Sequence, residues 1–265
     1  MSATHSLNSK QTRLFIFLSG IFLTNALLAE LIGVKIFSLE GTLGTAPAQI
    51  PLFGDWVLDF NLTAGVLLWP VVFITTDIIN EYFGKKGVRR ISYLTVAFIV
   101  YSFLIIFLVT RLTPAEFWLG SNSTMPDGTP FDMDYAYNKV FRQGLWIIVG
   151  SLVAFLIGQL LDVFVFQRLR RITGSGKIWL RATGSTLVSQ FVDSFVVLGI
   201  AFYIGADWTL AQWFSVGLVN YIYKFSIAIV LTPLLYVAHN VIDRYLGKEL
   251  SEEMMEEATT DTSFF

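Results

Sequence analysis

Long runs of apolar residues alternate with short polar stretches along this chain. A helix needs about 20 predominantly apolar residues to cross the hydrocarbon core of a bilayer, and six segments of the sequence reach that length. The predicted spans are Leu14–Ile36, Leu62–Phe83, Ile91–Thr110, Leu145–Phe166, Ala182–Ile204 and Trp213–Ala238. The pattern therefore predicts an all-α membrane protein with six transmembrane helices.

The charges between these spans predict their orientation. Lysine and arginine gather before the first span, in the second and fourth connections and after the last span, whereas Ser38–Asn61 and Gly205–Gln212 contain neither. The long third connection is acidic, and its carboxylates are Glu116, Asp127, Asp132 and Asp134. Because lysine and arginine are enriched in cytoplasmic loops, we expect both termini in the cytoplasm.

The same pattern divides the chain into a cytoplasmic tail (residues 1–13), a transmembrane domain (14–246) and an acidic tail (247–265) that we expect to be disordered. The N-terminal tail lacks a signal-peptide cleavage site, so we expect it to be retained. Ser38–Asn61 fits a short β-hairpin or lid, and Thr113–Asn138 fits an ordered outer loop. A solvated linker is the alternative for both.

Composition narrows the chemistry. Of the 265 residues, 54% are hydrophobic and 14% are charged, against about 25% charged in soluble domains. The chain has no cysteine, and His5 and His239 are its only histidines, so disulfides and thiolate chemistry are excluded and a histidine-built metal site is disfavoured. The net charge of −2 gives no indication of a nucleic-acid partner. We expect no metal, no cofactor and no catalytic residue.

Polar side chains inside the spans are the main functional signal. An ionisable group in the hydrocarbon costs about 2.5–3.5 kcal/mol on insertion scales, so it faces the bundle interior and marks a ligand or ion path. In FITTDIINEYFG (residues 73–84), spacings of three and four place Asp77, Asn80 and Glu81 on one helical face. The other intramembrane polar residues singled out are Asn25, Glu30, Gln159, Asp162, Thr186, Gln190, Asp193, Asn220 and Lys224.

Each of these has a local explanation as well. Glu81 could pair with the basic residues of GKKGVRR, Asp162 could pair with Arg168, and Asp193 with Lys224 could form a structural ion pair. As a set, amides and carboxylates beside aromatic rings suit a pocket for a flat heterocycle, whose edge they read and whose faces the rings cover. The aromatic candidates are Phe73, Phe155, Phe195 and Tyr221. A site for a hard cation built from the carboxylates is the alternative.

Four stretches together resemble the queuosine-precursor transporter family, of the vitamin-uptake-transporter type. They are WPVVFITTDIINEYFG (69–84), GQLLDVFVFQRLRR (158–171), ATGSTLVSQFVDS (182–194) and NYIYKF (220–225). The family's polar motif residues fall on Asp77, Gln159, Asp162, Asp193 and Lys224. The resemblance implies a six-helix fold similar to the substrate-binding components of energy-coupling-factor transporters. It also implies uptake, in the bacterial inner membrane, of a 7-deazaguanine base (the cyano or aminomethyl precursor of queuosine) for tRNA modification.

The predicted substrate-binding residues are Phe73, Asp77, Asn80, Gln159, Asp162, Gln190, Asp193, Asn220 and Lys224. Their chemistry does not separate a deazaguanine from another vitamin or nucleobase, and a homo-oligomer is compatible with the sequence. Proton entry through a membrane acid and metabolic trapping are both compatible ways to drive uptake.

Two other classes of protein are disfavoured. The first span carries Gly20-x-x-x-Thr24 in place of the Ala-x-x-x-Ala with which vitamin-binding subunits dock onto an energising module. Gly184-Ser185 with His239 invites comparison with rhomboid proteases. However, the serine lacks their Gly-x-Ser-Gly frame and His239 lies near the end of the last span.

Overall fold

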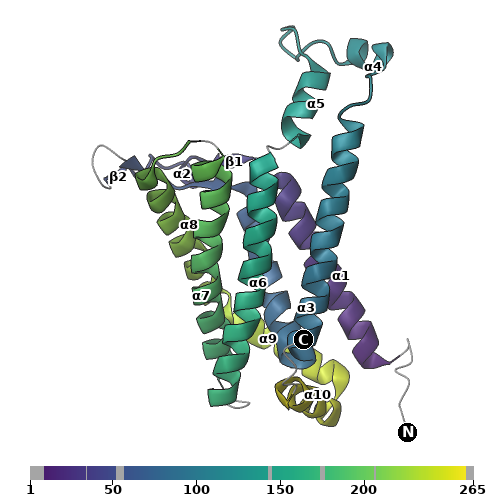
Figure 1. Cartoon of the computed structure of the whole chain (residues 1–265), viewed down its shortest axis with the longest axis vertical. Helices are drawn as coiled ribbons and strands as arrows, with labels where there is room; N and C mark the ends of the chain where they lie inside the picture. Colours follow the sequence, from purple (N-terminus) through teal and green to yellow (C-terminus); the bar gives the residue numbers. More distant parts are fainter. Residues whose placement is uncertain are drawn as a thin grey trace.

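The computed structural model describes residues 9–33, 35–51, 57–142, 145–173, 177–205 and 207–260, and Figure 1 shows long helices bundled side by side. One end of the bundle carries short strands, among them β1 (Ile36–Ser38), and the other carries α10 (Lys248–Thr260). We call these the strand end and the α10 end. Among the described residues, five helices are long and apolar enough to cross a membrane. The chain is thus an all-α, multi-pass membrane protein, as predicted.

The membrane-length helices are α1 (Lys10–Ile32), α3 (Trp69–Val109), α6 (Leu145–Thr173), α7 (Ile178–Leu198) with its π-helical continuation η2 (Gly199–Ile204), and α8 (Leu210–Val230). The side chain of Ser9 caps α1 by accepting a hydrogen bond from the backbone N–H of Thr12 at 3.2 Å. Lys10 Nζ donates to the carbonyl oxygen of Leu246 at 3.2 Å, so α1 begins close to the C-terminal part of the chain.

Helix α3 combines the second and third predicted spans in one folded-back element. Gly84 interrupts it with φ 62° and ψ −164°, a backbone conformation that is essentially restricted to glycine. In Figure 1 the blue first limb of α3 runs to the α10 end, and the second limb rises again toward the strand end. The two predicted spans therefore form limbs of a helical hairpin (residues 69–83 and 85–109). This explains why five continuous helices occupy a region predicted as six spans.

The last predicted span, Trp213–Ala238, is wrong as a single helix. Helix α8 ends at Val230, and α9 (Thr232–Leu246) starts with Pro233 in its first turn. Proline has no N–H to donate and its ring clashes with the preceding turn, so it breaks a helix but fits the first turn of a new one. Because of this break, α9 packs against α3 at the α10 end.

The connection Ser38–Asn61 contains short paired strands. This confirms the prediction of a short β-hairpin and not the alternative of a solvated linker. β1 pairs antiparallel with β4 (Asn61–Thr63), and β2 (Ile50–Pro51) pairs antiparallel with β3 (Val57–Leu58); residues 52–56 lie outside the described residues. Within α2 (Leu39–Leu43), Glu40 accepts hydrogen bonds from the backbone N–H groups of Phe60 at 2.8 Å and Ala48 at 3.4 Å. These bonds, that of Phe60 foremost, lower the pKa of the Glu40 carboxyl below its ordinary value of 4.5.

The third connection is ordered as well. It contains α4 (Glu116–Ser121) and α5 (Met133–Phe141), and an antiparallel bridge joins Thr124 to Pro130. The 3-10 helix η1 (Ala64–Leu67) leads from β4 into α3. Figure 1 shows α4 and α5 projecting beyond the strand end.

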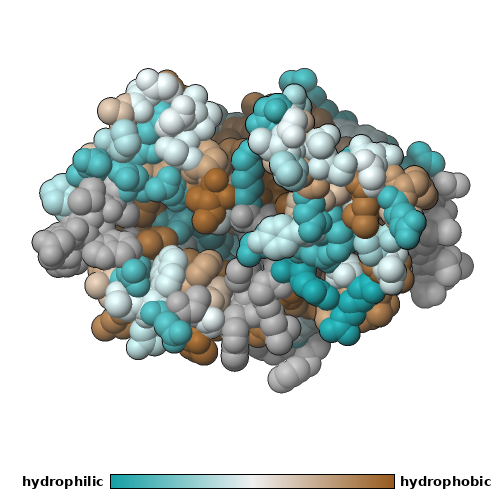
Figure 2. All heavy atoms as spheres, turned by 90° about the horizontal axis from the view of Figure 1, so that it is seen from above, coloured by the Kyte–Doolittle hydropathy of each residue, from teal (hydrophilic) through white to brown (hydrophobic). Residues whose placement is uncertain are grey.

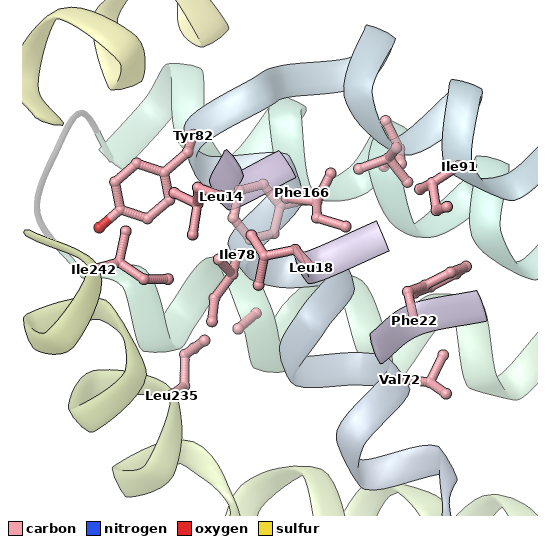
Figure 3. Close-up of a cluster of buried hydrophobic side chains, with 14 of the residues drawn as sticks. Leu14, Leu18, Phe22, Val72, Ile78, Tyr82, Ile91, Phe166, Leu235 and Ile242 are labelled. Carbon is pink, nitrogen blue, oxygen red and sulfur yellow. The ribbon is translucent and has the colours of Figure 1, made fainter. Parts of the chain in front are cut away.

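The hydrophobic core lies in the half of the bundle toward α10. Figure 3 shows side chains from α1, α3, α6 and α9 converging in one cluster, and its buried members include Leu18, Phe22, Ile78, Phe166 and Leu235. On the outside many large apolar side chains stay exposed, for example Phe98 and Leu104. Such a surface is unfavourable in water and is what a lipid-facing bundle requires.

The predicted disorder of the acidic tail is wrong for residues 248–260, which form α10; residues 261–265 lie outside the described residues. Ser251, Met254 and Ala258 share one face of α10 and are buried, at the spacing of an amphipathic helix. Gly84 makes this packing feasible because a Cβ there would lie 3.0 Å from the carbonyl oxygen of Ala258. The acidic composition thus covers only the outer face of a docked helix.

Candidate functional site

A cavity of about 470 Å³ opens among the helices at the strand end, within the 300–1,000 Å³ range of small-molecule sites. We call it the strand-end cavity. Figure 2 looks onto this end and shows the surface hollowed between two lobes, with hydrophilic residues in the hollow. The charged, polar and aromatic residues of its wall include Glu30, Trp69, Lys139, Arg142, Ser151, Phe155, Asp193, Ser194, Phe202, Asn220 and Lys224.

An interhelical ion pair lies in this wall. Lys224 Nζ on α8 donates to Asp193 Oδ2 on α7, and the two residues are only 8% and 6% exposed. The ammonium also lies 5.5 Å from the centre of the Trp69 ring, a cation–π distance. A buried pair gains little stability because both ions lose hydration. Beside an open cavity, however, it presents a charged donor and a charged acceptor to a ligand.

A second carboxylate, Glu30, lies in the same wall. The hydroxyl of Ser151 on α6 donates a hydrogen bond to Glu30 Oε1. Sequence reasoning noted Glu30 as an intramembrane acid but did not include it among the substrate-binding residues. Its partner is contributed by a helix that is distant in sequence, and the single signal available was the cost of placing a carboxylate inside an apolar span.

Aromatic rings supply the apolar part of the wall. Trp69 and Phe155 have ring centroids 6.3 Å apart, and both line the strand-end cavity. Phe73 stacks on Trp69 at 5.8 Å, one layer deeper. The other aromatic candidates, Phe195 and Tyr221, pack against Phe191 and are not part of this wall.

Five predicted residues form a separate group deeper in the bundle. Phe73, Asp77, Gln159, Asp162 and Gln190 surround a void of about 10 Å³ together with Thr76, Gly158 and Thr186. A void of that size holds about one water molecule, so it cannot hold a heterocycle in this conformation. We call this space, together with the residues that line it, the acidic void.

Asp162 is tied to α7 across the acidic void. The hydroxyl of Ser189 donates to Asp162 Oδ1 at 3.2 Å. The sequence left open a pair between Asp162 and Arg168, but Arg168 is exposed whereas Asp162 is buried. The carboxylate therefore belongs to the bundle interior.

Asn80 and Glu81 belong to a third group, at the α10 end. Asn80 is fully buried and its Oδ1 accepts a hydrogen bond from Gln167 Nε2 at 2.7 Å. Glu81 Oε1 pairs with Arg181 Nη2 at 2.9 Å and lies 3.6 Å from Arg170 Nη2. Glu81 thus pairs with arginines of α6 and α7. The local explanation from the sequence had been a pair with the basic turn GKKGVRR.

Arg170 extends this group to α10. Its guanidinium donates to the carbonyl oxygens of Glu81 at 2.8 Å and of Met255 at 2.5 Å. We call Asn80, Glu81, Gln167, Arg170 and Arg181 the clamp, because they join α3, α6, α7 and α10. Sequence reasoning interpreted both arginines as cytoplasmic loop charges, and nothing in the local sequence signals that each is at most 3% exposed.

The protease-like pair is not assembled. The Ser185 hydroxyl donates to the carbonyl oxygen of Ala182 at 3.1 Å. His239 Nδ1 lies 2.9 Å from Asp243 Oδ2 and its ring lies against Tyr82. The serine and the histidine therefore have separate partners.

Comparison with known proteins adds a functional context to this geometry. A family model described as "Putative vitamin uptake transporter" matches residues 63–238. This range includes all nine predicted substrate-binding residues, whereas Glu30 and α10 lie outside it. No solved structure matches the chain.

Three curated relatives cover most of the chain. A "Probable queuosine precursor transporter" of Haemophilus influenzae is 33% identical over 199 residues, which is 74% of this chain and 76% of that protein. A protein of the same name from Bacillus subtilis is 29% identical over 69% of this chain and 75% of its own length. The "Queuosine precursor transporter" of Escherichia coli is 32% identical over 66% of this chain and 71% of its own length.

Proposed function

The chain belongs to the vitamin uptake transporter family, a family of transporters and not of enzymes, and on that premise we propose that it takes up a queuosine precursor across the membrane. The observation that carries the proposal is the strand-end cavity, in which an ion pair, a second carboxylate, three aromatic rings and two further basic residues surround about 470 Å³. The names of the relatives give the proposal its substrate class.

The proposed substrate is a 7-deazaguanine base, the cyano or the aminomethyl precursor. Such a base presents amino and ring N–H donors, a carbonyl acceptor and a flat π-face. We assign the donors to Asp193 and Glu30, the carbonyl to Lys224 or Asn220, and the π-face to Trp69, all of which line the cavity. Charge-assisted hydrogen bonds of this kind are about twice as strong as neutral ones.

The proposed arrangement in the bacterial inner membrane has six crossings and both termini in the cytoplasm. Two limbs of α3 and the break between α8 and α9 are compatible with it, and α1 begins beside Leu246. The basic turn around Gly84 lies at the α10 end, which would face the cytoplasm by the rule that lysine and arginine stay inside. The strand-end cavity would then face the side from which substrate arrives. The proposed fold is similar to that of energy-coupling-factor substrate-binding components.

The family description supports a second candidate, a carrier for another vitamin or nucleobase. The same cavity chemistry suits any flat heterocycle with donors and an acceptor on one edge. Association with an energising module belongs to this alternative, and co-purification with an ATPase pair would support it.

The test is uptake of labelled 7-cyano-7-deazaguanine by cells that can neither make nor import the base, with queuosine in tRNA as a second readout. Wild type should restore both readouts, and Asp193→Asn or Lys224→Ala should restore neither. The matched control is Lys248→Ala, which removes a lysine that is 87% exposed on α10.

Membrane insertion of each variant is measured alongside. Uptake by the well-inserted cavity variants at the wild-type rate would contradict the site. No uptake by wild type would contradict the substrate, and other bases and vitamins would then be screened.

A further inference from the structure

Two buried carboxylates in the middle of the bundle take part in none of the ion pairs formed by the described residues. Asp77 and Asp162 are 5% and 7% exposed and both line the acidic void. Neither forms an ion pair with any residue that the structure describes. The pairs in this part of the chain are Glu81 with Arg181 and Arg170, and Asp193 with Lys224. Charges buried without partners are strongly unfavourable, so these carboxylates must either be protonated or be neutralised by a cation from elsewhere.

A buried amide oxygen at the same void points to the nature of that charge. Gln190 is 6% exposed, and its Oε1 has no hydrogen-bond partner in the described part of the structure. Gln159 lines the void too, and the Thr76 hydroxyl lies 3.5 Å from its Oε1. A buried carbonyl oxygen that loses water without gaining a donor is unfavourable, and a cation would satisfy it. Carboxylate, amide and hydroxyl oxygens are the ligands of hard cations.

The size of the void limits which cation fits. At about 10 Å³ it is close to one water-sized sphere. Mg²⁺ keeps several of its waters and Ca²⁺ takes six to eight oxygens, so both need more room. A proton shared by the two carboxylates would fit, but it would leave the Gln190 oxygen without a partner. A single desolvated Na⁺ satisfies the carboxylates and the amide oxygen together.

We infer that the acidic void is a Na⁺ site, with Asp77, Asp162 and the side-chain oxygens of Gln159 and Gln190 as ligands. It lies one layer below the strand-end cavity, since Phe73 of the void stacks on Trp69 of the cavity. Gly158, which lines the void, is also close to Asp193 of the cavity wall, because a Cβ added at Gly158 would lie 3.5 Å from the Asp193 Cβ. Na⁺ would therefore hold α3, α6 and α7 together beside the substrate. This coupling rests on the proposed function, whereas Na⁺ binding itself does not.

The binding test uses the full-length protein purified in detergent. Its melting temperature is measured while NaCl replaces choline chloride at constant ionic strength and pH, and a parallel series uses KCl. Na⁺ at a hundredfold excess over Kd should raise the melting temperature by about 5 °C, and K⁺ should act only at much higher concentration.

Gln190→Leu and Asp162→Asn should each raise the half-effective Na⁺ concentration at least about tenfold. Gln190→Leu also separates loss of a ligand from a folding defect. If Gln190 were an unsatisfied amide and not a ligand, its replacement by leucine would leave the Na⁺ response unchanged. Asp207→Asn is the control, since this exposed aspartate precedes α8 and its loss should preserve the wild-type response.

Each remaining outcome overturns the inference. A melting temperature that responds to pH but not to Na⁺ indicates a shared proton, and one that responds to neither indicates a void filled by water. An equal Na⁺ response in wild type and in both void variants places the ion elsewhere.

A final arm separates this inference from the proposed function. Proteoliposomes are given the labelled base with and without an inward Na⁺ gradient, and the gradient should raise initial uptake several-fold. Na⁺ binding without uptake of any base would contradict the proposed function alone. Uptake that ignores the Na⁺ gradient would contradict the coupling alone.

Discussion

The strand end and the α10 end of this bundle use the same kinds of polar side chain for opposite purposes. At the strand end, Lys224 and Asp193 pair beside about 470 Å³ of open space. At the α10 end, Glu81 and Arg181 pair with at most 1% exposure, and further hydrogen bonds from Arg170 complete the clamp. Both are interhelical ion pairs in a membrane protein. The difference is the space left beside them: the pair at the strand end borders a cavity and belongs to the proposed ligand site, whereas the pair at the α10 end is enclosed.

Removing one member of the clamp should give the largest effect. Arg181→Met leaves Glu81 buried with Arg170 as its remaining cation, at 3.6 Å. Loss of one partner of a buried pair costs about 3–5 kcal/mol, and we expect the lower half of that range because Arg170 stays. The measurement is the melting temperature and the yield of monodisperse protein.

The matched control for the clamp is the double variant Glu81→Gln with Arg181→Met. It removes both charges of the shorter pair, but it also removes the carboxylate 3.6 Å from the buried Arg170, so it should recover only part of the lost stability. A double variant no more stable than Arg181→Met would mean that Glu81 is needed by Arg170, or that Arg181 acts mainly through its other contacts, such as that with the Phe166 ring.

The second feature of the α10 end is the turn of α3 at Gly84, on which α10 packs. Gly84→Ala adds a Cβ 3.0 Å from the Ala258 carbonyl oxygen at a φ of 62°. Strain of this kind costs about 1–3 kcal/mol, so the melting temperature should fall by roughly 3–8 °C. Gly20→Ala, a position with no atom within 4 Å of the added Cβ, should not lower it. Equal effects of the two variants would contradict close packing of α10 on the turn.

At the strand end the same kind of change should affect transport far more than stability. In Lys224→Met, water in the strand-end cavity can hydrate Asp193, so the loss should fall between the values for exposed and buried pairs, about 1–2 kcal/mol. Uptake of the base should nevertheless be abolished. A loss of stability as large as that of Arg181→Met would show that the pair is a structural joint after all.

The smallest effect concerns the short strands above the cavity. Because the pKa of Glu40 is lowered in the folded chain, its stabilising contribution is fully present above the ordinary carboxyl pKa and is lost as pH falls through the lowered value. Glu40→Gln should therefore speed hydrogen exchange of the Phe60 amide at neutral pH. Corrected for intrinsic exchange, this difference should vanish well below pH 4.5. A difference that persists there would contradict the role of the charged carboxylate.

The sequence by itself determined the membrane class, most of the span positions and the family resemblance, because apolar runs and motif residues are local properties. It also identified most of the carboxylates and amides inside the bundle, since the cost of burying them applies wherever they end up, but it missed Gln167, the two arginines and several buried hydroxyls. The turn at Gly84 and the break before Pro233 had local signals too, a basic glycine-flanked turn and a proline.

Only the tertiary structure decided where each polar residue lies and what surrounds it. Asp77, Asn80 and Asp193 look alike in sequence, yet they lie in the acidic void, the clamp and the cavity wall. The order of α10 and the burial of Arg170 and Arg181 likewise depend on partners far away in the chain. Helical periodicity fixes which face of a helix is polar, but the neighbour that packs there, and the space it leaves, follow from how whole helices fit together.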